Sequence, residues 1–308
     1  MIVSIIKQIA VFSIFILIGF LLEKTKSLPK NSGEVISKIE TKLLLPVYVF
    51  YGLAESVTVK NIKAYSVTAL YGLIFLIVAF GVGIVFSLPF APKGRMRNIY
   101  IYLFTVTNFG YFGFPFIEGV FGEQVKAYMI MFCIPLKIFT YTVGLYLLCG
   151  KSDNKKRFIF DPIIIGLTLG IIFGLLPIKL PLVLETVLSK LSDCMSPLAM
   201  ILLGLTIGAS PVLKLFMGVK AYIVSAIRLI LIPAIVGALC LLFGARGNNL
   251  LFSVFVSAMP IGLNVVVFLQ NDKDDAYFGA RCCFLSVLFS MGTIPLIYYL
   301  MTCAGIAQ

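Results

Sequence analysis

Histidine is absent from this chain of 308 residues, and acidic side chains are scarce, with 13 Asp and Glu against 25 Lys and Arg. Without histidine, a Ser-His catalytic pair and a His-ligated metal site are both excluded. The seven cysteines form no C-x-x-C pair, so we expect small buried side chains rather than a zinc site or a disulfide framework. The apolar segments also lack paired carboxylates. The sequence therefore predicts neither an enzyme nor a protein that holds a metal or cofactor.

Charged residues make up only 12% of the chain, whereas hydrophobic residues make up 60% and the mean hydropathy is +1.07. These values are typical of integral membrane proteins. A helix needs about 20 mostly apolar residues to span a bilayer, and about ten such segments use nearly the whole chain. The predicted spans are Ile2–Leu22, Ser37–Ala54, Ala64–Leu88, Asn98–Phe121, Val125–Leu148, Phe160–Leu176, Val183–Gly208, Ala221–Phe243, Asn249–Leu269 and Ala276–Met301.

The net charge of +12 does not predict a nucleic-acid partner, because the basic residues gather in short loops between the predicted spans. Loops rich in Lys and Arg alternate with poorer ones; Lys151–Arg157 is a rich loop, and Lys126 lies in a poor one. The positive-inside rule places the rich loops in the cytoplasm, and an even number of spans then puts both termini outside it. We expect a protein of the plasma membrane, such as a bacterial inner membrane, with the lipid bilayer as a partner.

The two halves of the chain resemble each other. Lys63–Phe86 aligns without a gap on Lys220–Phe243, and Ile36–Pro46 aligns on Leu188–Pro197 with one residue of slip. Each half holds about five spans. Because this number is odd, the second half enters the membrane from the opposite side and is inverted relative to the first. We therefore predict an all-α integral membrane fold of two inverted five-helix repeats. The predicted parts are residues 1–150 for the first repeat, 151–161 for a cytoplasmic central loop, and 162–308 for the second repeat.

One predicted span in each half, the fourth and the ninth, is interrupted at its centre by Gly, Pro and Asn. The interruptions are Asn108–Pro115 and Met259–Asn264. Proline breaks the helical hydrogen-bond ladder and glycine weakens it, and a membrane tolerates irregular backbone only where protein or water surrounds it. Paired breaks in corresponding positions indicate the binding site of a secondary transporter, where half-helix N-termini attract an anion.

Asparagine amides at these breaks can donate hydrogen bonds to an anion without carrying charge themselves. The alternative is that the prolines only kink their helices and the Asn side chains only join helix pairs. The candidate substrate-binding residues are Asn108, Gly113, Pro115, Pro260, Gly262 and Asn264.

Two ionisable residues, Asp193 and Arg228, fall well inside predicted spans. Charge is costly there and marks either function or a partner. Both residues are candidates for an ion or coupling site near the substrate. The alternative is an Asp–Arg pair that holds the seventh and eighth helices together.

Glycines recur every four residues on the sixth predicted span, at Gly166, Gly170 and Gly174. They make one smooth face that allows close approach of another helix. We expect this face to pack within the monomer; a homodimer contact is the alternative.

Four short stretches carry a resemblance to a known family. They are Asn108–Pro115 with the following Phe121-Gly122-Glu123, Leu191–Leu205, Arg228–Pro233 and Ala258–Gly262. In these stretches the chain resembles the auxin efflux carrier family, which includes plant PIN-type carriers and many bacterial permeases. The resemblance implies inverted repeats of the bile-acid-symporter type, whose fourth and ninth helices cross at prolines that match Pro115 and Pro260. It also implies a substrate-facing Asn108.

Together with the breaks, the resemblance implies a secondary transporter of small organic anions, such as auxin-like or malate- and malonate-like carboxylates. Such a transporter would work by alternating access. A sodium-coupled symporter of the bile-acid type is the first alternative. An intramembrane enzyme and a channel are further alternatives, disfavoured by the missing histidines and carboxylate pairs and by the asymmetric placement of the polar residues.

Overall fold

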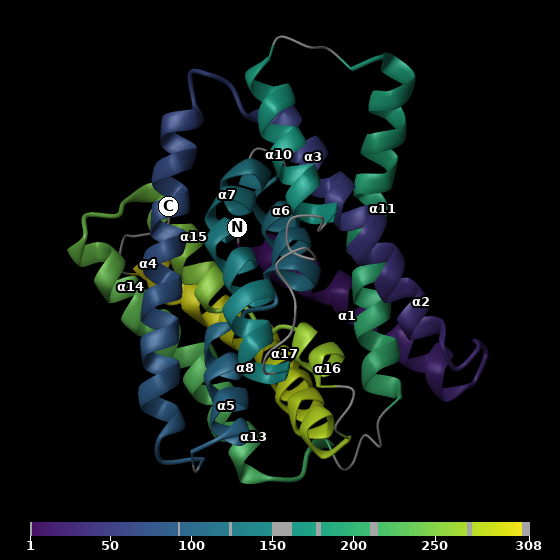
Figure 1. The fold of residues 1–308 in the computed structure, drawn as a ribbon, viewed down its shortest axis with the longest axis vertical. Coiled ribbons are helices and arrows are strands. Elements are labelled where there is room, and N and C mark those ends of the chain that lie inside the picture. The colour runs from purple at the N-terminus through teal and green to yellow at the C-terminus, as the bar shows by residue number, and fades with distance from the viewer. Residues whose placement is uncertain are drawn as a thin grey trace.

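The chain folds almost entirely into helices in a computed structural model (Figure 1). The structure describes residues 2–91, 93–122, 125–149, 162–176, 180–209, 215–269 and 273–303. Within these ranges the β-structure is a single isolated bridge between Thr107 and Ile261. The central loop that the sequence predicts at 151–161 lies outside the described residues.

The helical elements follow the predicted spans closely, and the label η marks a π-helical turn. In the first half they are α1 (Ile2–Lys24), α2 (Ser32–Ile39), η1 (Glu40–Leu44), α3 (Leu45–Ser56), α4 (Ile62–Ser87), α5 (Arg95–Thr105), η2 (Phe109–Gly113), α6 (Phe114–Phe121), α7 (Lys126–Phe139), η4 (Thr140–Gly144) and α8 (Leu145–Cys149). In the second half they are α10 (Pro162–Leu175), α11 (Leu182–Gly208), α13 (Val219–Ala226), η5 (Ile227–Leu231), α14 (Ile232–Leu242), α15 (Gly247–Ser257), α16 (Asn264–Phe268) and α17 (Lys273–Cys303).

Six helical stretches of the described chain are long and apolar enough to cross a membrane, as expected for an integral membrane protein. They are Val3–Lys24, Ile62–Ser87, Lys126–Cys149, Leu182–Gly208, Val219–Leu242 and Asp274–Cys303. The other predicted spans fall short for local reasons. The fourth and ninth are broken, the second carries charges around Glu40, and α10 is only 14 residues long.

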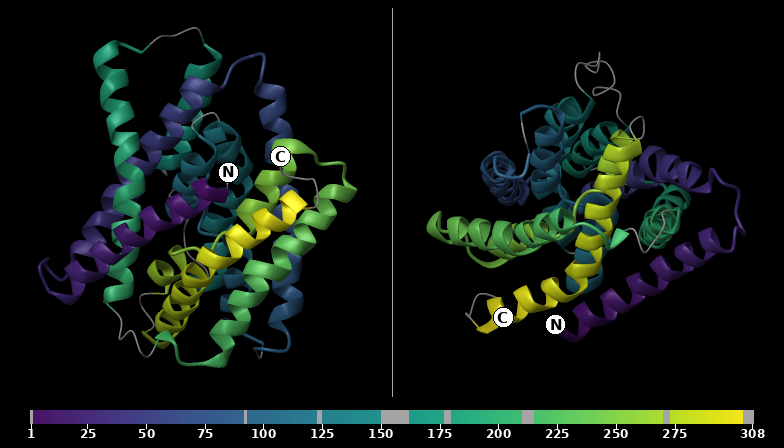
Figure 2. Two further views of the ribbon diagram at one scale, coloured as in Figure 1. Left: turned by 180° about the vertical axis from the view of Figure 1, so that it is seen from behind. Right: turned by 90° about the horizontal axis from the view of Figure 1, so that it is seen from below.

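The helices pack into two bundles. The small bundle contains α1, α2 with η1 and α3, α10 and α11, because α1 packs on α11 and α3 packs on both α10 and α11. The large bundle contains the remaining elements, in which α4 packs on α5 and α7, α14 on α15, and α13 on α17. Figure 1 shows α2, α3 and α11 on one side and α4, α13 and α14 on the other. Seen from behind, α1 and α17 both cross the molecule obliquely, and they contact each other between the bundles (Figure 2).

Glycines set the closest helix contacts of the small bundle. A Cβ atom built on Gly166 would lie 2.5 Å from the Pro46 carbonyl oxygen, and one on Gly170 would lie 2.8 Å from that of Phe50. The predicted glycine face therefore packs within the monomer, against α3. Where α1 crosses α11, Gly19 and Gly204 face each other, and a Cβ on Gly204 would overlap the Ile16 carbonyl oxygen.

We predict that Gly204→Ala lowers the thermal unfolding temperature in detergent. The added methyl group has to push α1 away from α11, and overpacking of this kind costs about 1–3 kcal/mol. Gly81→Ala is the matched control, because a Cβ on Gly81 in α4 meets nothing within 4 Å. An unchanged unfolding temperature for Gly204→Ala would show that the two helices are not in tight contact.

Candidate substrate site

The two predicted breaks meet in space and pair with each other. Thr107, after α5, forms an antiparallel bridge with Ile261, after α15. The Asn108 N–H donates to the Pro260 carbonyl at 2.8 Å, and the Gly262 N–H donates to the Val106 carbonyl at 3.2 Å. Each unwound segment thus supplies backbone partners that the other has lost. The bilayer offers no such partner, so this pairing stabilises the two breaks inside the protein.

Side chains from neighbouring helices of the large bundle form hydrogen bonds with further backbone groups of the second break. The Arg228 Nη1 in η5 donates to the Ser257 carbonyl at 2.7 Å, at the C-terminal end of α15. A cation is favourable at this end of a helix, where carbonyl groups lack helical partners. The Ile261 N–H donates to Ser286 Oγ of α17 at 3.0 Å. These contacts fix the position of the second break.

Gly262 allows the close approach of the two segments. A Cβ atom there would lie 3.1 Å from the Thr107 carbonyl oxygen, which is tighter than ordinary van der Waals contact. Pro260 fits the same crossing because it lacks an N–H and contributes only its carbonyl oxygen. Both predicted residues therefore lie at the crossing.

Asn108 starts the second half of the first broken helix. Its carbonyl accepts hydrogen bonds from the Phe112 and Gly113 N–H groups, at 3.3 and 2.9 Å. The residue is only 2% exposed, and its Nδ2 finds no acceptor among the described residues. The neighbouring Thr107 hydroxyl is also buried without a partner in the described part of the chain. The crossing thus holds two buried polar side-chain groups without a hydrogen-bond partner among the described residues.

Pro115 does not lie at the crossing, so the expectation that both prolines mark it is wrong for this residue. Pro115 follows the π-helical turn η2 and continues into α6. Pro46 and Pro233 likewise come two residues after η1 and η5. A proline ring clashes with the carbonyl four residues earlier, and a wider π-helical turn relieves that clash. Proline marks widened turns here, in addition to the break at Pro260.

The other two predicted residues lie on the helices that leave the crossing. Gly113 ends η2, and a Cβ atom there would lie 3.1 Å from Met129 Cε in α7. Asn264 is half-buried and begins α16, the short helix after the second break.

Asp193 and Arg228 do not form the ion pair considered from the sequence. Asp193 is exposed on α11 in the small bundle, where it lines a polar cleft of about 280 Å³ with Tyr51, Glu185 and Lys190. Arg228 is fully buried in the large bundle and bonds the Ser257 carbonyl instead. The structure therefore gives Arg228 a positioning role at the second break.

A buried polar cluster, which the sequence analysis missed, joins the two bundles. It consists of Lys126 and Glu118 from the large bundle and Tyr48 and Ser192 from the small one. Lys126 Nζ donates to Ser192 Oγ at 3.0 Å, lies 3.5 Å from Glu118 Oε1, and sits 4.1 Å from the centre of the Tyr48 ring. The Tyr48 hydroxyl donates to Glu118 Oε2 at 2.5 Å. Position in the sequence assigns Lys126 to a loop, but the residue is only 8% exposed.

Comparison with known proteins gives the family. The sequence model described as "Membrane transport protein" matches residues 4–157 and 150–298. The chain belongs to this membrane transport family. This is the auxin efflux carrier family that the sequence motifs resemble, and membership makes the protein an integral membrane transporter.

Relatives of this transporter occur in archaea. It is 25% identical over 292 residues to an uncharacterized transporter of Methanothermobacter thermautotrophicus, covering 92% of this chain and 94% of the relative. It is 27% identical over 296 residues to an uncharacterized transporter of Methanocaldococcus jannaschii, with the same shares covered. The similarity thus extends over nearly the whole length of all three chains.

We predict that Lys126→Met lowers the thermal unfolding temperature of the transporter, because it leaves the Glu118 carboxylate with fewer partners. The double variant Lys126→Met/Glu118→Gln should recover part of the loss. Residues in one polar network show interaction free energies of about 0.5–3 kcal/mol. Lys63→Met, which removes an exposed lysine on α4, is the control. If the two single effects simply add in the double variant, the cluster does not act as a unit.

Proposed function

We propose that the transporter carries small organic anions, carboxylates foremost, and binds them at the crossing of the two broken helices. The observation that carries this proposal is the buried Asn108 amide, whose Nδ2 has no acceptor among the described residues. A buried donor without a partner costs free energy, and a carboxylate oxygen would satisfy it. The adjacent Thr107 hydroxyl offers a second donor.

The charge around the crossing favours an anion. Residues 104–110 and 258–264 contain no Asp or Glu. The helix that starts after Asn108 presents its first N–H groups, of Phe109, Gly110 and Tyr111, at this point, before the first helical bond at Phe112. These N–H groups and the positive end of the helix dipole attract negative charge.

The proposed architecture is two inverted repeats, residues 1–150 and 162–308, joined by a cytoplasmic loop. Three features support it. Both broken helices begin with a half of 11 residues, α5 and α15. The matched stretches that start at Lys63 and Lys220 each begin one residue inside a helix. Each bundle takes segments from both halves, as expected when two inverted repeats exchange equivalent helices.

Transport would proceed by alternating access, in which the large bundle moves against the small one. Both unwound segments of the crossing belong to the large bundle, so they can move together without losing the hydrogen bonds between them. The helix after Asn108 packs on α11, so this motion would uncover the proposed site.

The decisive experiment is uptake into proteoliposomes of labelled dicarboxylates, monocarboxylates and indole acids. We expect at least one carboxylate to be carried, and an excess of unlabelled substrate to compete. The same panel with and without a sodium gradient separates this proposal from a sodium-coupled symporter of the bile-acid type. Failure of every anion, or transport of cations alone, would contradict the proposal.

We predict that Asn108→Ala and Asn264→Ala each weaken substrate binding with little loss of stability. Losing a hydrogen bond to a charged ligand group costs about 1.5–3 kcal/mol, which is roughly a ten- to a hundredfold loss of affinity. Competition binding and thermal unfolding measure the two effects separately. Asn31→Ala, at an exposed position before α2, is the control. Wild-type affinity in the Asn108 variant would place the site elsewhere.

We predict that position 154 lies in the cytoplasm and that both termini lie outside it. The reason is the alternation of basic residues between loops. Fusions of a reporter that is active on only one side of the membrane, placed at position 154 and at the C-terminus, test both points. A cytoplasmic signal from the C-terminus would contradict the proposed arrangement of ten spans.

A further inference from the structure

Glu40 is a buried carboxyl group outside the crossing. It is 0% exposed, so it faces neither lipid nor water, and both carboxyl oxygens are without a hydrogen-bond partner in the described residues. It is the first residue of η1, the π-helical turn that precedes Pro46. Such turns occur frequently at functional sites, because the extra residue redirects side chains.

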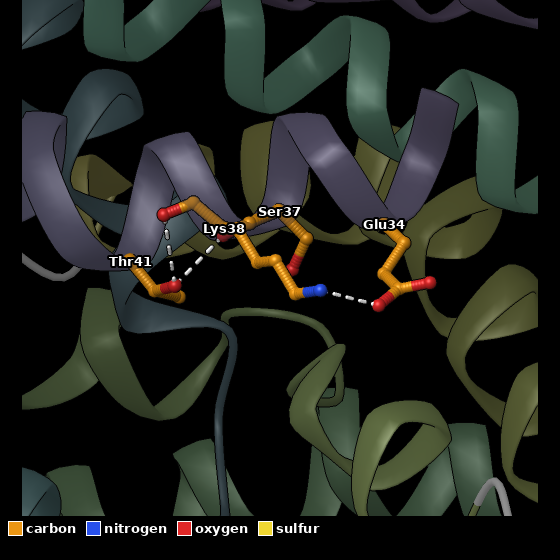
Figure 3. Close-up of polar contacts among 4 residues, drawn as sticks. All are labelled: Glu34, Ser37, Lys38 and Thr41. Carbon is orange, nitrogen blue, oxygen red and sulfur yellow. Dashed lines mark hydrogen bonds and ion pairs between the residues drawn. The ribbon is translucent and has the colours of Figure 1, made fainter. Parts of the chain in front are cut away.

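The charged residues next to Glu40 in the sequence form no ion pair with it among the described residues. Lys38 pairs with Glu34 one turn earlier, at 2.5 Å, and both side chains are more than half exposed (Figure 3). The Thr41 hydroxyl donates to the Ser37 carbonyl at 2.8 Å, within the same helix (Figure 3). Lys42 is exposed. The lysines on either side of Glu40 therefore do not neutralise it.

Among the described residues, the helices packed against η1 also place no positively charged side chain next to Glu40. α10 carries no titratable side chain. Those of α11 are all exposed, namely Glu185, Lys190, Asp193 and Cys194. In α3, the hydroxyl of Tyr48 bonds Glu118, and Tyr51 faces the cleft beside α11.

Among the described residues, one titratable group of the large bundle interacts with Glu40. Tyr111 of η2 is buried, its hydroxyl lies beside the Ser37 side chain, and it interacts electrostatically with the Glu40 carboxyl. Tyr111 belongs to the first turn after the crossing. A Cβ atom built on Gly110 of the same turn would lie 3.7 Å from Leu45 Cδ2, directly after η1, so the segment that would move during transport lies beside the turn that carries Glu40.

We propose that Glu40 is the proton-binding site that couples transport to a proton gradient. An unpaired carboxylate is too costly in such a place, so in the closed arrangement the group is the neutral acid. When η2 moves away, water reaches the carboxyl, the O–H bond breaks, and the proton passes to water on that side. The empty transporter returns with the carboxylate uncovered and hydrated, and the carboxylate takes up a proton on the other side before η2 covers it again. The inference rests on the proposed function and names its coupling ion.

Proton binding can be tested without a substrate. Infrared difference spectra of the protein in liposomes, recorded while the pH is raised from neutral, should show a protonated carboxyl band that disappears. Glu40→Gln, which has the shape of the neutral acid and should fold, should lack this band. Glu34→Gln removes an exposed carboxylate from the same helix and should keep it. Identical spectra for wild type and Glu40→Gln would overturn the assignment.

Coupling is tested with labelled malate and malonate. Wild type and Glu34→Gln should accumulate the anion when the vesicle interior is alkaline. Glu40→Gln should lose this accumulation but keep exchange of internal for external anion, which needs no net proton movement. Accumulation by Glu40→Gln at the wild-type level, or accumulation driven by sodium instead, would overturn the coupling role. If wild type carries neither these nor the other anions of the panel, the proposed function fails, and the infrared result still decides whether Glu40 binds a proton.

Discussion

The structure depends on one constraint, which is that every backbone polar group inside a bilayer needs a partner from the protein. Two unwound segments would each violate it, yet together they meet it, because Asn108 bonds Pro260 and Gly262 bonds Val106. The side chains of Arg228 and Ser286 satisfy groups that remain. The crossing therefore joins α5, α15, η5 and α17 into one unit. Its hydrogen bonds stabilise the large bundle where two of its helices are interrupted.

Local chemistry predicted which helices are broken, but not where the first one breaks. Gly, Pro and Asn residues locate the interruptions within a few residues, and Pro260 and Gly262 lie at the crossing as expected. Pro115 does not mark the break, because a proline is compatible with a helix that has a widened turn before it. The break lies instead at Thr107, beside the partner strand, and sequence alone does not show where a partner from the other half arrives.

Charge placement was predicted less well, for a related reason. Counting by position assigns Lys126 to a loop, although its long side chain reaches back into the protein. An Asp193–Arg228 pair seemed reasonable because the two residues lie on consecutive predicted spans. These helices belong to different bundles, and consecutive membrane helices need not be neighbours. The glycine face of α10, by contrast, was predicted correctly, since small residues every four positions need only one close neighbour.

The distribution of hydrogen bonds also determines how the protein can open. Further unwinding at the crossing would expose backbone groups that are now paired, at a cost of several kcal/mol each in hydrocarbon. Among the described residues, the hydrogen bonds between the bundles are made by side chains, including Gln8 to the Pro115 carbonyl, Ser13 to Met291 Sδ, and Lys126 to Ser192. Water can replace such bonds at about 0.5–1.5 kcal/mol each. Access to the buried Asn108 amide is therefore cheaper through sliding of the large bundle along α11 than through any change in the crossing itself.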